Sequence, residues 1–229
     1  MGPEGEPTGE TPEGISREVE STQERTRESE IRANIEYWQS LGIKLEEQEV
    51  RTAVEAVPER EGYNWIIVIP QGTKIWQLGS QVASFDSDLE FRNLAEVIEM
   101  SRKSNETYAI AAHYRREVDK DSIGRKAKTA KNWENTGEEF MTPLECIIAE
   151  GRWYKDNKNH LNAKTLTLCP GSRSENGQVP YLEYSTESNP PQEFMRVSRI
   201  VKEIILDSCS PEKRHRSLGV RRVITKDSK

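Results

Sequence analysis

Cysteine is scarce in this chain, and its spacing argues against two common kinds of small protein. Only three cysteines occur among 229 residues, at Cys146, Cys169 and Cys209, and no two of them form a C-x-x-C pair. A disulfide framework uses an even set of cysteines, and a zinc knuckle uses paired ones. We therefore expect reduced cysteines that pack in the interior, and we predict no metal and no cofactor.

Long apolar runs are also missing. No run approaches the roughly 18 residues needed to span a bilayer, and the first ten residues, MGPEGEPTGE, have neither a basic start nor an apolar segment. A cytoplasmic protein with no membrane partner is predicted. Apolar residues make up 34% of the chain and charged residues 31%. The mean hydropathy is -0.83, so a sizeable fraction of the residues is expected outside any packed core.

Charge is uneven along the chain and marks two tails. Residues 1–30 hold nine acids and three bases, which equals the net charge of -6 of the whole chain, whereas residues 210–229 hold seven bases and two acids. The first segment is rich in Glu, Gly, Pro, Thr and Ser, and it buries too little surface to offset the cost of ordering. We predict three parts: a disordered acidic tail at 1–27, a single α+β domain at 28–208 and a basic flexible tail at 209–229.

Within the domain, the apolar patterns predict an α+β fold, with a small antiparallel or mixed sheet packed by helices and with disordered tails. Runs rich in β-branched and aromatic residues predict strands at 63–69, 107–116, 164–169 and 178–184. Apolar residues at helical spacing predict helices at 30–42, 89–101 and 142–155.

Two of these helices have recognisable start signals. Thr142, Pro143 and Glu145 have the order of an N-cap, a first helical residue and the partner in a capping box. Ser29 is the expected cap of the first helix. Residues 192–206 have helical spacing, but both a helix and a strand remain open there.

The loop PGSR, at Pro170–Arg173, is the most suggestive candidate site. It follows an expected strand and can turn several backbone N–H groups toward one point, while Arg173 adds a bidentate donor for a phosphate or a carboxylate. The alternative is a tight turn in which Arg173 pairs with Glu145 or Glu175. The loop lacks the longer glycine-rich spacing and the lysine of a P-loop.

An enzyme acting on such an anion would combine the loop with neighbouring polar groups. His160 and Cys169 lie on either side of a short connection and are candidates for a base and a thiolate, although no third, orienting group is identifiable. The alternatives are a turn histidine and an inert packing thiol. The ligand-binding candidates are Gly171, Ser172, Arg173, His160 and Glu145.

A longer series of residues resembles a known family. The series consists of Thr142, Leu144, Glu145, Glu150, Tyr154, His160, Leu161, Thr167, Leu168, Cys169, Gly171, Ser172, Arg173, Gly177, Val179 and Pro180. It is similar to a family of bacterial proteins of uncharacterised function that is common in candidate-phylum genomes. The resemblance covers roughly residues 31–185, and it implies no particular activity.

The C-terminal run KRHRSLGVRR is the only concentrated basic segment, and it suggests contact with nucleic-acid phosphates. The contacting residues would be Lys213, Arg214, Arg216, Arg221 and Arg222. A sequence pI of 5.4 and the lack of interleaved aromatics weigh against this reading.

The function predicted first is therefore a non-enzymatic binding or interaction module, whose partner is a protein or an anionic small molecule. An anion site or enzyme at the PGSR loop and nucleic-acid binding by the tail are the alternatives.

Overall fold

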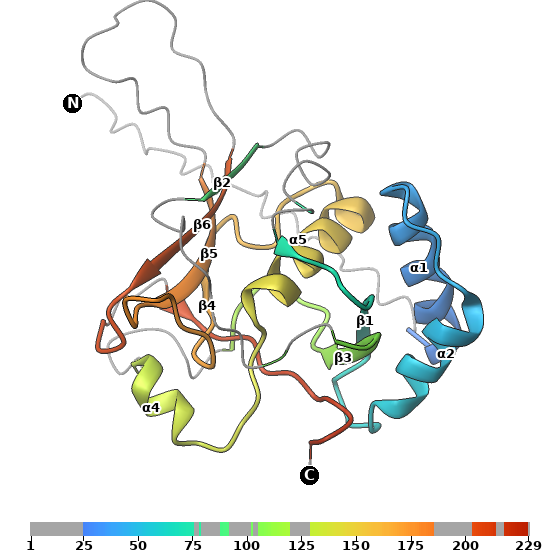
Figure 1. Ribbon diagram of the computed structural model, residues 1–229, viewed down its shortest axis with the longest axis horizontal. Helices are drawn as coiled ribbons and strands as arrows, with labels where there is room; N and C mark the ends of the chain where they lie inside the picture. Colours follow the sequence, from blue (N-terminus) through green and yellow to red (C-terminus); the bar gives the residue numbers. More distant parts are fainter. Residues whose placement is uncertain are drawn as a thin grey trace, which may run out of the picture.

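The fold is built on two β-sheets that lie on either side of one central helix (Figure 1). The computed structural model describes residues 25–75, 78, 88–91, 102, 105–119, 129–185, 203–213 and 218–228. The helices are α1 Arg27–Ser40, α2 Glu47–Ala56, α4 Ala130–Glu134 and α5 Pro143–Asn157. The strands are β1 Trp65–Ile69, β2 Asp88–Phe91, β3 Tyr108–Ala112, β4 Leu166–Leu168, β5 Val179–Ser185, β6 Glu203–Cys209 and β7 Leu218–Gly219. The predicted α+β class is confirmed.

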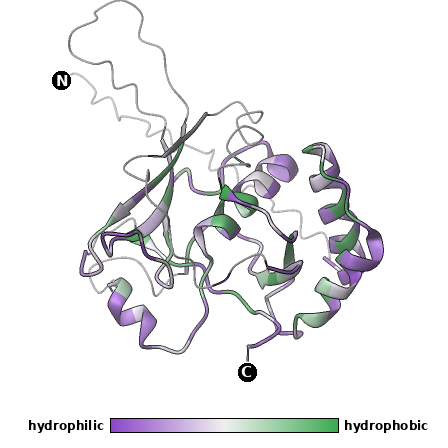
Figure 2. Ribbon diagram, in the orientation of Figure 1, coloured by the Kyte–Doolittle hydropathy of each residue, from purple (hydrophilic) through white to green (hydrophobic). Residues whose placement is uncertain are grey.

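The first sheet pairs β1 with β3 in antiparallel register, with Trp65 opposite Ala112. Successive side chains of a strand point to opposite faces, and both faces of this sheet are buried. Ile66 and Val68 pack with apolar residues of α1 and α2, whereas Ile67 and Ile69 belong to the cluster that contains α5. Burial on both sides explains why the strand sequence WIIVI is apolar throughout. Figure 2 shows this hydrophobic colour on β1 and β3.

The second sheet has five strands in the order β2-β6-β5-β4-β7. The predicted hairpin of 164–169 and 178–184 is confirmed, since β4 and β5 pair antiparallel with Thr167 opposite Leu182. One face of this sheet contributes Leu182 and Leu206 to the cluster around α5. The other face contributes Val179 and Cys209 to a cluster with α4. The elements therefore stack in the order α1/α2, first sheet, α5, second sheet, α4.

Strands form part of one predicted helix and part of the segment for which both a helix and a strand remained open. Residues 203–206 of the segment with helical spacing belong to β6, and residues 88–91, at the start of the predicted 89–101 helix, form β2. In β6, the consecutive residues Ile204, Ile205 and Leu206 are all buried. A strand buried on both faces is an unbroken apolar run, and its period does not distinguish it from a helix. The remaining parts, 92–101 and 192–202, lie outside the described residues.

The prediction of a basic flexible tail at 209–229 also needs correction, because residues 218–228 pack as part of the domain. Val220, Val223 and Ile224 are buried. Leu218 and Gly219 of β7 pair with β4, and Ile224 forms a two-way backbone bridge with Ala111 of β3. The apolar residues between the basic ones supply the reason, since their burial stabilises the segment in the core. The segment joins the second sheet to the first.

Helix α1 begins inside the predicted acidic tail. Its N-cap is Thr26, not Ser29, and Ser29 instead closes the capping box as the third helical residue. Gly42, just past its end, has the left-handed φ of 77° that glycine adopts readily. Residues 1–24 lie outside the described part of the chain. Among the described residues, no helix is long and apolar enough to cross a membrane.

Candidate functional site

Helix α5 carries three charged side chains in the protein interior. The predicted capping box is confirmed: the Thr142 side chain accepts from the Glu145 backbone, and Glu145 accepts from the Thr142 backbone. Glu145, Glu150 and Arg152 all lie within 1% of complete burial. A buried charge is costly unless it is paired and hydrogen-bonded, so the partners of these three residues decide what α5 does.

Glu145 fixes the start of α5 to β3 and to Arg102. Its two carboxylate oxygens accept from Nε and Nη2 of Arg102, each at 2.8 Å, and from the hydroxyl of Tyr108 at 2.9 Å. Burial, followed by the neighbouring Glu145 charge, raises the pKa of Tyr108. Since every donor belongs to the protein itself, Glu145 is a structural anchor in this geometry.

Glu150 fixes the turn that follows α5. Its carboxylate accepts from the backbone N–H of Leu161 at 3.0 Å and from the backbone and side chain of Asn162 at 3.1 and 3.0 Å. One of its oxygens lies 2.9 Å from Nδ1 of His160. The ring of His160 also stacks on Tyr184, with centroids 3.6 Å apart and planes at 12°. His160 is thus held at its edge and on one face.

The polar contacts continue from this turn to the C-terminal segment. Asn162 accepts from the Thr167 hydroxyl at 2.6 Å, and that hydroxyl accepts from Nε of Arg221 at 3.1 Å. The other nitrogens of Arg221 donate to the backbone carbonyls of residues 115, 116 and 117. Burial lowers the pKa of Arg221 to about 10. Its guanidinium is enclosed by neutral oxygen atoms of the described chain.

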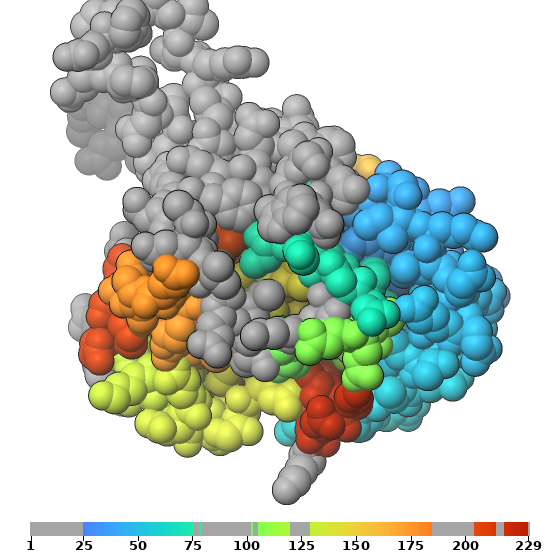
Figure 3. Space-filling model, in the orientation of Figure 1, coloured from blue at the N-terminus to red at the C-terminus, as the bar shows by residue number. Residues whose placement is uncertain are grey.

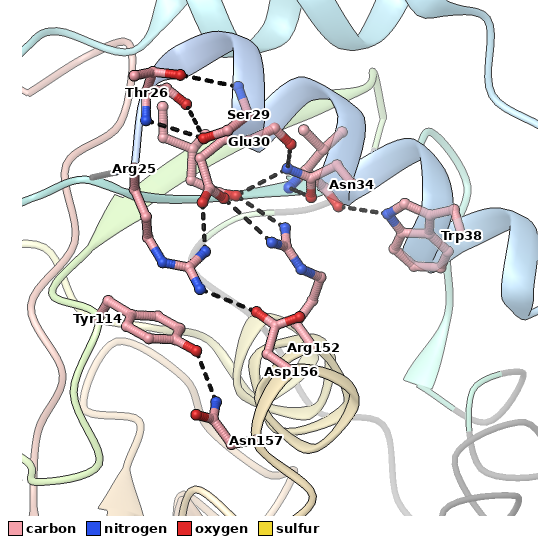
Figure 4. A network of polar contacts seen from close by, with 12 residues as sticks. Arg25, Thr26, Ser29, Glu30, Asn34, Trp38, Tyr114, Arg152, Asp156 and Asn157 are labelled. Atoms are coloured by element: carbon pink, nitrogen blue, oxygen red, sulfur yellow. Dashed lines mark hydrogen bonds and ion pairs between the residues drawn. The ribbon is translucent and has the colours of Figure 1, made fainter. Parts of the chain in front are cut away.

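Arg152 joins α5 to α1 through a shared carboxylate (Figure 4). Its Nη2 lies 3.2 Å from Oε2 of Glu30, and Nη1 of Arg25 lies 2.5 Å from Oε1 of the same residue. Arg25 also pairs with Asp156 at 3.1 Å, and its guanidinium lies 3.5 Å from the ring centroid of Tyr114. This Arg–Glu–Arg arrangement closes one end of the interface between α1 and α5.

Side chains of α1 and α5 also cover the outer edge of β1. The Asn34 side chain accepts from the backbone N–H of Val68 and donates to the carbonyl of Ile66, both at 2.9 Å (Figure 4). Trp38 donates its ring N–H to the carbonyl of Val68 at 2.9 Å, and Arg152 donates to that of Ile66 at 3.2 Å. An unpaired strand edge is a template for wrong pairing, and these side chains take the place of a neighbouring strand.

The guanidinium of Arg173 has hydrogen-bond partners within the PGSR loop itself. Nη1 of Arg173 donates to the carbonyls of Pro170 and Ser172 at 2.6 and 2.7 Å, and Nη2 pairs with Glu134 at the end of α4. The prediction that Arg173 pairs with Glu145 or Glu175 is therefore wrong. Gly171 is exposed and Ser172 is buried, with no hydrogen-bond partner for its hydroxyl in the part of the chain that the structure describes. The guanidinium thus connects the carbonyl groups of the loop to the end of α4.

The predicted site residues consequently have separate partners. Glu145 pairs with Arg102, His160 with Glu150, and Arg173 with Glu134. The thiol of Cys169 contacts another thiol, that of Cys146, rather than forming a base and thiolate pair with His160.

The basic residues of the C-terminal segment differ in their exposure. Arg221 is buried, Arg222 pairs with Glu138 and Asp119, and Lys213 is exposed. Arg214 and Arg216 lie outside the described residues. The two innermost arginines therefore already have protein partners at the positions where phosphate contacts were predicted.

Several residues that organise the interior were missed by sequence reasoning. These are Glu30 and Asn34 of α1, Arg102, and Arg152 of α5. They come from three distant stretches of chain, and each needs tertiary contacts to be recognised. One signal was present, because CIIAEGRW places a glutamate and an arginine two residues apart in an otherwise apolar run of the helix. Charges inside such a run indicate buried pairs.

One hollow lies between α2, the start of β3 and the C-terminal turn. Its volume is about 500 Å³. The small side chains of Ala53, Ala56 and Ala109 line it, and Lys226, paired with Glu106, also lies on its wall. Figure 3 shows the C-terminal residues, in red, beside β3 in green. We call this hollow the α2 pocket. Its full lining is Gln48, Glu49, Thr52, Ala53, Ala56, Arg102, Glu106, Thr107, Tyr108, Ala109, Thr225, Lys226 and Asp227.

A second hollow, of about 690 Å³, lies at the start of α1. Three arginines and three glutamates are among its lining residues, and Arg25 and Arg27 are already held in ion pairs. It has fewer alanines than the α2 pocket, since Ala111 is the one alanine among its lining residues. Among the described residues, no group of three or more His, Cys, Asp or Glu side chains has the arrangement of a metal site.

Comparison with known proteins gives no match to a family model, to a curated protein or to a solved structure. The function of this chain must therefore be inferred from the chemistry of the site itself.

Proposed function

We propose that this protein is a non-enzymatic binding module that acts in the cytoplasm and takes a small organic ligand into the α2 pocket. The observation that carries the proposal is the pocket, which is open and has three alanines and three threonines among its lining residues. Its volume of about 500 Å³ is in the usual range for ligand sites. The similarity to a bacterial family stays a prediction from the sequence.

The chemistry of the pocket wall favours a ligand with an apolar body and polar ends. Alanines supply an apolar surface, and Glu106 and Lys226 offer opposite charges next to it. Their side chains are about half exposed, with relative accessibilities of 64% and 47%. Exposed ion pairs contribute little to stability, so a ligand can exchange with them at small cost.

The state of the ionisable residues supports binding over catalysis. Glu145, Glu150 and Arg152 are all held by hydrogen bonds to other parts of the chain. A general acid or base needs access to substrate. The three cysteines are free and buried, which fits a reducing compartment such as the cytoplasm.

A thermal-shift screen with a pocket-filled variant tests the proposal. Amines, amino acids, carboxylic acids, nucleotides and short peptides are screened for a rise in the melting temperature of the native chain. A ligand at a hundred times its Kd stabilises the folded state by about 2.7 kcal/mol. The same ligand should give no shift with Ala56→Trp, because the indole occupies the pocket from an exposed helix position.

Glu55→Trp is the matched control, since Glu55 is exposed on the same helix and is not part of the pocket lining. It should keep the ligand-induced shift. A shift that survives Ala56→Trp would place the ligand elsewhere, and turnover of a bound compound would contradict a non-enzymatic role.

A further inference from the structure

Two of the three cysteines meet in the protein interior. Sγ of Cys146, in the second turn of α5, lies 3.6 Å from Sγ of Cys169, which directly follows β4. Both residues are buried in the central core cluster. Cys209 belongs to a different cluster, between the second sheet and α4. The chain thus holds one close pair of thiols and one separate thiol.

We propose that Cys146 and Cys169 are a redox-active pair that a peroxide converts to an intramolecular disulfide. A disulfide has a sulfur–sulfur bond of about 2.05 Å, so the two sulfur atoms must approach by about 1.5 Å. Cys169 stands at the start of a turn, with its carbonyl accepting from the N–H of Ser172. Side-chain rotation with a small shift of this turn supplies the movement.

The contact between the two sulfur atoms makes them a pair, and either thiol can be the one that the peroxide oxidises first. The thiolate is the reactive form of whichever thiol reacts first. Burial, followed by the contact with Cys146, raises the pKa of Cys169.

The reaction has two steps. The thiolate of one of the two cysteines attacks one oxygen of hydrogen peroxide, the O–O bond breaks, and a sulfenic acid forms while hydroxide leaves. The sulfur of the other cysteine then attacks the oxidised sulfur and displaces the hydroxyl group, which leaves as water with the proton of the attacking thiol. In total, two thiols and one peroxide give one disulfide and two water molecules. The thiols lose two electrons, and the peroxide gains them.

The disulfide would connect the first half of α5 to the beginning of the PGSR loop, across 23 residues of sequence. In a reducing compartment such bonds are usually transient and sensory. This inference is independent of the proposed ligand pocket, which lies at α2.

Peptide mapping of the oxidised full-length chain tests the proposal. The folded protein is treated with hydrogen peroxide, remaining thiols are alkylated in denaturant, and the chain is cut with trypsin without reduction. We expect the peptides 132–152 and 165–173 to appear joined, with a mass two hydrogens below their sum. Dithiothreitol should separate them. The peptide 203–213, which contains Cys209, should remain singly alkylated.

Serine variants provide the controls. Cys209→Ser should form the same joined peptides at the same peroxide concentration, and either Cys146→Ser or Cys169→Ser should abolish them. If a serine variant fails to fold, the peptide map of the native chain still decides. Separate alkylation of Cys146 and Cys169 after Cys209 has been oxidised would overturn the proposal, as would a disulfide that forms only in the denatured chain.

Discussion

At the scale of single residues, Asn34 shows how one side chain replaces a strand. Its amide pairs with two backbone groups of β1, the N–H of Val68 and the carbonyl of Ile66, in a position where water has no access. Arg152 also donates to Ile66, so the N–H of Val68 depends on Asn34 alone among the contacts of the described chain. An unsatisfied buried donor costs about 1–3 kcal/mol.

Asn34→Ala should therefore lower the free energy of unfolding by about 2–3 kcal/mol, from one orphaned donor and a lost second hydrogen bond. Urea denaturation followed by circular dichroism measures this. Gln39→Ala, on the exposed side of the same helix, is the control and should change stability by less than about 0.5 kcal/mol. Equal stability of the two variants would mean that β1 does not rely on the amide.

The sequence could single out the candidate site residues as unusual, but it could not predict which residues they pair with. The capping role of Glu145 follows from local spacing, and it is confirmed. Its pairing with Arg102 could not follow, because 43 residues separate the two and only the fold brings them together. Arg173 illustrates the same limit, since its partner Glu134 is 39 residues away. Sequence rules for helix caps and for side-chain pairs relate only residues that lie within about one helical turn of each other.

At the scale of elements, the C-terminal segment departs furthest from its prediction, because it connects the two sheets where a tail was expected. Its backbone pairs with β4 at one end and with β3 at the other, and between them the N–H of Met141 donates to the carbonyl of Arg221 at 3.0 Å. The basic residues suggested a tail, whereas the apolar residues between them form an irregular strand. Charge composition alone does not indicate whether alternate residues are buried.

Ending the chain at Ser217 should therefore abolish cooperative folding, because it removes the buried Arg221 and the backbone partners of β3 and β4. We expect loss of the near-ultraviolet circular dichroism signal and of a single thermal transition. A chain ending at Lys226 keeps the bridge between Ala111 and Ile224 and should retain both signals. A cooperative transition in the shorter chain would show that the segment is dispensable.

The helical spacing of the residues in β6 has a physical explanation at the same scale. It lies between β2 and β5, so both of its edges are paired. Its faces are covered as well, since Ile204, Ile205 and Leu206 are all buried. These apolar residues are consecutive and charged residues stand on both sides of them, a pattern shared by buried strands and by short helices. The strand at 65–69 was predictable because all of its residues, WIIVI, are aromatic or β-branched.

At the scale of the whole molecule, α5 is the common support of both sheets. The first sheet and α1 pack on one side of it, and the second sheet packs on the other. Such a helix has no solvent-facing side along much of its length, which is why Glu145, Glu150 and Arg152 had to find partners inside. The predicted single sheet could not account for these partners, since it would leave one side of α5 open.

The close packing of α5 makes Gly151 a decisive position. A Cβ atom at this residue would lie 2.4 Å from the hydroxyl oxygen of Tyr37 in α1, a distance at which something must move. Tyr37 is fully buried, so its ring has no space to yield. Intrinsic propensity alone predicts that Gly→Ala within a helix is stabilising by about 0.5–1 kcal/mol. Steric contact predicts the opposite sign, and overpacking of this kind costs about 1–3 kcal/mol.

We expect Gly151→Ala to destabilise the molecule as a whole, because displacement of α1 from α5 also disturbs the support of both sheets. Hydrogen exchange measured by mass spectrometry should show faster exchange in β1 and in β5 together, by a similar factor. Ala149→Gly, on the same helix, separates the two effects, since it lowers helix propensity without adding an atom against Tyr37. Faster exchange confined to α1 and β1 in Gly151→Ala would mean that the two sheets unfold independently, and a rise in stability would show that Tyr37 yields to the added methyl group.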